Sequence, residues 1–72
     1  MTTGEMIEYT NRFKGIMSMP DSYTRDVRLA SLMTDLEGYG IPMFGKERIV
    51  DFENHNPFVM RLYRTVSESR VF

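Results

Sequence analysis

His55 is the only histidine among the 72 residues, and histidine is the side chain that most often serves as a general acid or base near neutral pH. It stands in the segment Asn54-His55-Asn56-Pro57. Polar residues directly before a proline are typical of a turn that caps a helix. Because no nucleophile or second base accompanies His55 in this segment, a capping turn is the favoured interpretation. We expect no catalytic residue, and we expect the protein not to be an enzyme.

The carboxyl groups do not form acid–base pairs either. Asp35 and Glu37 cannot face each other on a helix, and Asp51 and Glu53 would share a side only on a strand. The glycines have neither the P-loop nor the dinucleotide-binding spacing. With no cysteine and a single histidine, a zinc site is not expected. The sequence therefore predicts no cofactor and no metal.

The basic residues suggest an alternative function, a small DNA-binding regulator. The segment from the second predicted helix to Glu53 has the outline of a helix-turn-helix, with a turn near Gly40–Gly45. However, acidic residues lie in the element that would enter the groove, and they oppose phosphate. A solvated helix face explains the basic side chains as well, so nucleic acid is the less favoured partner. The residues of this alternative are Lys46, Arg48, Arg61 and Arg64.

The overall charge and hydropathy favour a cytoplasmic protein. The formal net charge is −1 with both signs interspersed, which gives no global attraction to nucleic acid or to an anionic membrane. No apolar run approaches the ~20 residues that span a bilayer, and the first residues lack the pattern of a signal peptide. Short, cysteine-free, single-domain chains of this kind are typical of bacterial or phage accessory proteins.

A chain of this length is marginally stable alone, since it buries only about 60% of its unfolded surface. Disulfides are excluded because the chain has no cysteine. Close helix packing or a partner must then supply the remaining stability. We expect that partner to be another protein or a second copy of the chain, for instance in a homodimer.

Apolar spacings of three and four residues predict three main helices. They span about Glu5 to Met17, Pro20 to Gly38, and Pro57 to Ser67. Thr2 and Glu5 have capping-box spacing, Ser18 or Asp21 is expected to cap the second helix, and Asn56 the last. Residues 46–53 suit a helix or a strand equally well. A short helix is preferred because a lone strand would have no pairing partner.

The expected fold is all-α, a small three-helix bundle with a short additional helical element between the second and third main helices. It forms a single domain over residues 1–72, with 1–4 and 70–72 frayed. Ile7 falls off the main apolar face of the first helix. The predicted core is Tyr9, Phe13, Ile16, Leu29, Leu32, Met33, Leu36, Phe52, Phe58, Leu62 and Val66.

The second helix carries a second apolar stripe, formed by Tyr23, Val27 and Ala30, beside its main stripe. A helix with two apolar stripes usually contacts two neighbours. The chain also has seven methionines, a residue that is frequent at adaptable binding surfaces. Met6, Met17 and Met33 suit the core, whereas Met19, Met43 and Met60 fall outside the main faces and could join the tail Val71-Phe72 in an exposed apolar patch.

These features predict a small protein-interaction or regulatory module that docks through an apolar face. The predicted partner-binding residues are Tyr23, Val27, Met43, Phe44 and Met60.

Overall fold

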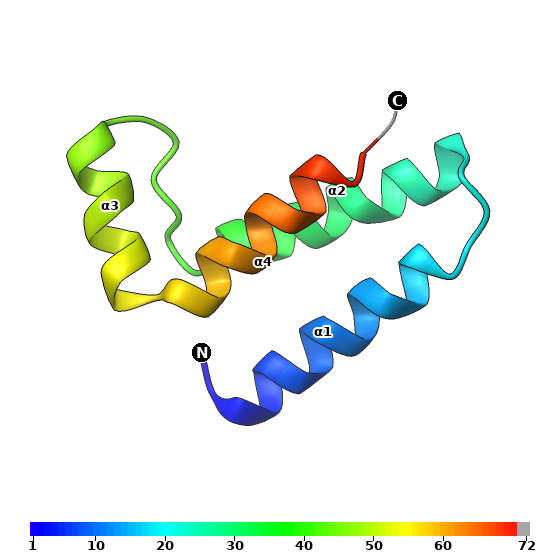
Figure 1. Ribbon diagram of the computed structural model, residues 1–72, viewed down its shortest axis with the longest axis horizontal. Helices are drawn as coiled ribbons and strands as arrows, with labels where there is room; N and C mark the ends of the chain where they lie inside the picture. The colour runs from blue at the N-terminus through cyan, green and yellow to red at the C-terminus, as the bar shows by residue number, and fades with distance from the viewer. Residues whose placement is uncertain (71–72) are drawn as a thin grey trace.

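The computed structural model describes residues 1–70, which form four helices and no strand. In chain order they are α1 (Thr3–Met17), α2 (Tyr23–Glu37), α3 (Lys46–His55) and α4 (Pro57–Glu68) (Figure 1). The three long helices form a bundle, and the shorter α3 lies across one end of it (Figure 1). The predicted fold class is confirmed, and residues 46–53 are helical.

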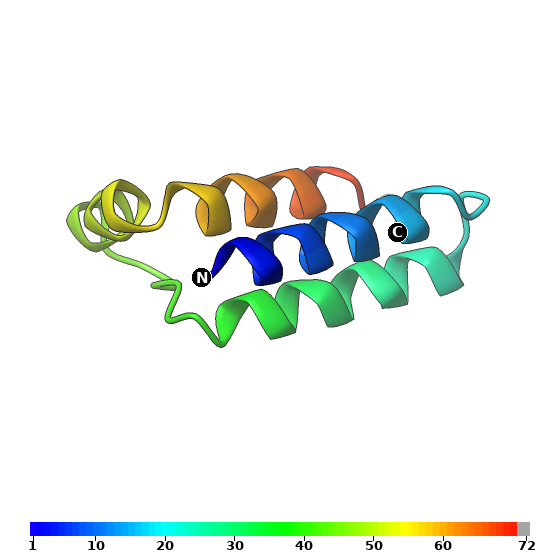
Figure 2. The same ribbon diagram turned by 90° about the horizontal axis from the view of Figure 1, so that it is seen from below.

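Each of the three long helices packs against the other two, and α4 also packs against α3. The chain runs in one direction along α1 and α4 and in the opposite direction along α2 (Figure 1). Figure 2 shows α1 in front of the seam between α4 and α2. One side of the α2–α4 pair is thus covered by α1, and the other side lacks a helix.

Polar caps set where the first two helices begin. The Thr2 hydroxyl accepts from the Glu5 backbone N–H, and the Glu5 carboxylate accepts from the Thr2 N–H, so the predicted capping box is confirmed. Thr2 is therefore the cap of α1, and Met1 before it packs against the core. Helix α2 begins later than predicted, with Ser22 as its cap in place of Ser18 or Asp21. Residues 18–22 instead reverse the chain between two antiparallel helices.

The core is built on leucine. All four leucines of the chain are buried, and Leu29, Leu32 and Leu36 of α2 have no exposed surface. Every predicted core residue is either buried or packed against this cluster. The prediction missed three buried apolar residues, and the structure places each of them on α4 or in the loop before α3. They are Ile41, Val59 and Met60.

Tyr39, just beyond α2, connects the end of that helix to the start of α1. Its hydroxyl donates a hydrogen bond to the Glu5 carboxylate, and its ring meets Tyr9 edge-on, with centroids 6.0 Å apart. Together with the two bonds to Thr2, the Tyr39 bond lowers the pKa of Glu5 to about 2. Donation to Glu5 also raises the pKa of Tyr39. This contact closes one end of the α1–α2 pair.

We expect Tyr39→Phe to reduce the loss of stability on acidification. The pKa of Glu5 in the folded protein lies below its ordinary value of 4.5, so its contribution is present above that pH and is lost as the pH falls toward 2. Removing the hydroxyl raises the pKa of Glu5 and shrinks that loss. Urea unfolding of both proteins at neutral and acidic pH measures the difference, and an unchanged acid dependence would show that the Tyr39 bond is not its source.

Candidate protein-interaction surface

The predicted partner-binding residues do not form one patch. Tyr23 and Val27 lie one turn apart at the start of α2 and are exposed, Tyr23 by 74%. Met43 and Phe44 lie beyond the other end of the same helix. A helix of 15 residues is about 22 Å long, so the two exposed pairs are separated by the length of the bundle.

The expectation that Met60 projects toward solvent is wrong, since only 7% of it is exposed. Arg64, one turn further along α4, pairs with Glu53 of α3. The side of α4 that carries Met60 is therefore the side that α3 covers. The sequence could not show this, because the position of α3 depends on the corner at Asn56, the one residue between the two helices.

The other methionines follow the prediction in part. Met6 and Met33 are half-buried, and Met33 packs against the core. Met17 was expected in the core but is 37% exposed, because it occupies the last turn of α1 at the end of the bundle. Met19, expected in an exposed patch, is half-buried in the turn that follows. Val71 and Phe72, the remaining members of that patch, lie outside the described residues.

The loop between α2 and α3 holds Met43 and Phe44 outward; we call these two residues the loop patch. Their exposed fractions are 70% and 78%. Gly40 and Gly45, with φ of 91° and 94°, bracket the segment in a backbone conformation that favours glycine. Between them Ile41 is buried and fixes the base of the loop. The sequence predicted a turn near Gly40–Gly45, and in the structure this segment has one buried apolar side chain and two exposed ones.

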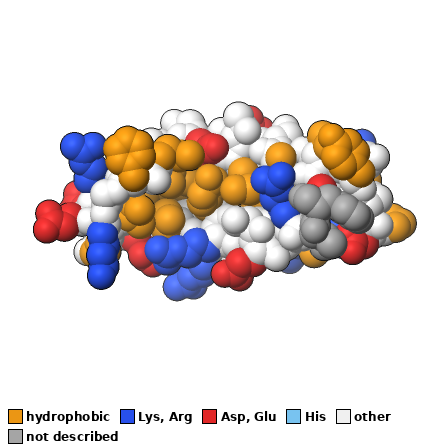
Figure 3. Space-filling view, turned by 90° about the horizontal axis from the view of Figure 1, so that it is seen from above, with side chains coloured by type: hydrophobic (Ala, Val, Ile, Leu, Met, Phe, Trp, Pro, Cys, Tyr) orange, Lys and Arg blue, Asp and Glu red, His pale blue; other side chains and the backbone are white. Residues whose placement is uncertain are grey.

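One face of the α2–α4 pair is not covered by α1. Figure 3 views this side, where apolar side chains form a band from the α3 end toward the middle and another apolar group lies at the opposite end. Along the α2–α4 seam Met33 and Tyr63 are half-buried. Burial, and then the negative charge of Glu37, raise the pKa of Tyr63. This face is apolar but mostly filled, so its accessible apolar groups are concentrated at its ends.

One of the basic residues predicted for DNA binding, Arg64, forms an ion pair between two helices. Arg64 makes two hydrogen bonds to the Glu53 carboxylate, of 2.7 and 3.1 Å. Its charge is therefore balanced within the protein. Lys46 and Arg48 are exposed on α3, whose sequence also carries three acidic residues, and Arg61 is exposed on α4.

The α2–α3 segment does not have the geometry of a helix-turn-helix, in which the two helices pack against each other. Within residues 1–70, α3 packs against α4 and not against α2. The cause is the extended loop between Gly38 and Gly45, which carries the chain away from α2 before α3 begins (Figure 1).

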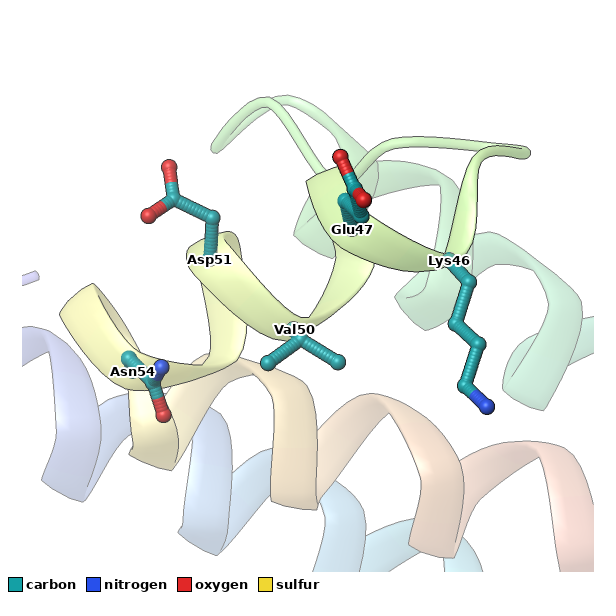
Figure 4. A pocket seen from close by; sticks show the side chains of 5 residues that line it. All are labelled: Lys46, Glu47, Val50, Asp51 and Asn54. Carbon is teal, nitrogen blue, oxygen red and sulfur yellow. The ribbon is translucent and has the colours of Figure 1, made fainter.

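The outer face of α3 carries a shallow hollow whose lining is mixed in charge. All of its lining residues belong to α3, and Figure 4 shows their side chains: Lys46, Glu47, Val50, Asp51 and Asn54. His55 occupies the last turn, where its Nδ1 lies 2.8 Å from the Asp51 carbonyl oxygen. The segment before Pro57 was expected to be a capping turn, but α3 continues through His55 and the Asn56 side chain makes no cap on α4.

The described residues include no group of three or more His, Asp or Glu side chains placed to hold a metal ion. No helix within residues 1–70 has both the length and the hydropathy needed to cross a membrane. Comparisons with protein-family models, with curated proteins and with solved structures gave no match. The functional argument therefore rests on the surface of the molecule itself.

Substitution of Met60, which is buried, and of Met43, which is exposed, should have different effects on the stability of the protein. We expect Met60→Ala to lower the free energy of unfolding by about 2–5 kcal/mol, as other buried Met-to-Ala changes do. Met43→Ala should change it by no more than about 0.5 kcal/mol, since the side chain contacts little. Denaturant unfolding measures both, and equal small effects would place Met60 on the surface after all.

Reversing the α3–α4 ion pair should release α3 without unfolding the bundle. The pair is partly exposed and contributes about 0.2–1 kcal/mol. Arg64→Glu brings two carboxylates together, so we expect faster amide hydrogen exchange along α3 and unchanged exchange in α2. Adding Glu53→Arg restores an opposite pair and should restore protection. Unaltered exchange in the single variant would show that apolar packing alone holds α3.

Proposed function

We propose that this protein is a small, non-enzymatic protein-interaction module that binds another protein through the loop patch. The observation that carries the proposal is the exposure of Met43 and Phe44, by 70% and 78%, on a loop whose base is fixed by buried Ile41. Two adjacent large apolar side chains at such exposure have no stabilising role within the described residues. A partner that covers them removes both from water.

The energetics favour a specific contact. Complete burial of a side chain such as Met or Phe contributes about 1.5–3 kcal/mol. The two together correspond to at least about a hundredfold in affinity. The buried isoleucine already anchors the base of the loop, which lowers the conformational entropy that is lost on binding. Flexible methionine beside a rigid aromatic ring also suits a surface that adapts to its partner.

The test is co-purification from cytosolic extract of the native host, with the full chain tagged, washed at low and high salt and treated with nuclease. We expect a protein partner that survives both treatments. Met43→Ser combined with Phe44→Ser should lower its recovery at least about tenfold. Tyr23→Ser combined with Val27→Ser is the matched control, because it removes an exposed apolar pair at the opposite end of α2.

Equal recovery with the loop variant and the unchanged protein would exclude the loop patch as the binding site. Material that disappears with nuclease or salt would instead support the DNA-binding alternative, because phosphate contacts weaken steeply as salt rises. Circular dichroism of each variant confirms that helix content is retained, since neither pair belongs to the core.

A further inference from the structure

A shallow groove of about 390 Å³ lies along α1, next to Phe58 at the start of α4. Residues three and four apart along α1 form one wall, and Phe58 at the start of α4 contributes to the other. The groove is distinct from the loop patch and shares no residue with it. Its lining residues are Thr3, Met6, Ile7, Thr10, Asn11, Lys14 and Phe58.

The floor of the groove is apolar. Ile7, which falls off the core-facing side of α1, is 57% exposed there, and Met6 and Phe58 are half-buried beside it. A smaller hollow of about 110 Å³ continues between Met6 and Phe58 toward Val59. That volume suits a single apolar side chain. The groove therefore has a place for one anchor residue and a longer surface along α1.

The charge of the groove is positive. Lys14 is the one charged lining residue, and Arg61 lies one turn beyond Phe58 on the same side of α4. Neither side chain forms an ion pair within residues 1–70. Arg12 and Glu5 of α1 are turned toward α2, where they contact Asp35 and Tyr39. An apolar segment with acidic flanks would complement this surface.

The outer face of α3 carries one exposed apolar residue and two carboxylates, together with one lysine. Val50 is 46% exposed. Glu47 and Asp51 project from one edge of this face, and Lys46 and Asn54 project from the other edge together with Val50 (Figure 4). Neither acidic residue is paired with a lysine or arginine within residues 1–70. The segment from Lys46 to Asn54 spans about 12 Å. This is shorter than the α1 wall from Thr3 to Lys14, of about 16 Å, so the helix fits along it.

We propose that two copies of this chain form a twofold-symmetric dimer, in which α3 of each copy lies in the α1–α4 groove of the other. Val50 occupies the apolar floor near Ile7, and the two carboxylates of α3 meet Lys14 and Arg61. One helix in a shallow groove buries too little surface for a stable complex, whereas twofold symmetry repeats the contact. The added burial compensates for the small core of a 72-residue chain.

The proposal is tested with two charge-reversed forms of the full chain, measured by sedimentation velocity over a concentration series. One form, Lys14→Glu with Arg61→Glu, makes the groove acidic. The other, Glu47→Lys with Asp51→Lys, makes α3 basic. We expect the unchanged protein to dimerise and each form alone to have its dimer dissociation constant raised at least about tenfold.

Mixing the two reversed forms is the decisive measurement. Both grooves then face an α3 of opposite charge, so we expect a heterodimer about as stable as the original dimer. Arg28→Glu, on the exposed side of α2, is the control for net charge and should leave dimerisation unchanged. Ile7→Glu and Val50→Glu should each give a monomer with unaltered helix content, because both side chains are exposed in the monomer.

A monomeric unchanged protein at every concentration would overturn the proposal. Dimers that persist in both reversed forms, or a mixture that fails to associate, would also overturn it. The loop variant Met43→Ser/Phe44→Ser should still dimerise, which separates this contact from the binding proposed for the loop patch. Failure of one proposal therefore leaves the other standing.

Discussion

The packing of α1 and α4 against the leucine stripe of α2 is the constraint on which the rest of the structure depends. Leu29, Leu32 and Leu36 of that helix are fully buried, and no other helix contributes as many side chains without exposed surface. A leucine stripe at this spacing brings two neighbours to adjacent sides of one helix. Both α1 and α4 run antiparallel to α2 and pack against this single leucine stripe, and a short connection joins α1 to α2. Weakening it would separate both neighbours at once.

A core this small leaves apolar surface that the chain cannot cover. Each of the three long helices buries only one side in the core. The fourth helix, α3, has 10 residues and covers only part of α4. Ile7, Val50 and the loop patch remain outside for this reason, and they lie on three different parts of the molecule. Polar contacts at the periphery, such as Glu5 with Tyr39 and Glu53 with Arg64, then fix the orientations of elements that the core holds weakly. Exposed apolar groups on a well-oriented framework are what a binding protein requires.

Local sequence patterns predicted the helices, the Thr2–Glu5 capping box and most of the core, because each depends on residues within one or two turns of each other. The candidate site was predicted less well. Met43 and Phe44 are exposed in the loop after α2, whereas Tyr23 and Val27 are exposed near the start of that helix. Met60 is covered because α3 folds onto α4, a contact whose geometry depends on one junction residue. The predicted helix-turn-helix outline does not form because the extended loop between Gly38 and Gly45 carries the chain away from α2 before α3 begins.

The sequence by itself determined that this chain is all-helical, that leucine forms its core and that it has more apolar side chains than that core needs. Periodicity and composition are enough for those conclusions, since they are properties of each segment alone. Only the tertiary structure decided which surplus side chains face solvent and which lie side by side. The α1–α4 groove joins Ile7 to Phe58 across 51 positions of the chain, and no local pattern carries that information. Contacts of this kind arise from how helices pack, and packing is set by the whole core at once.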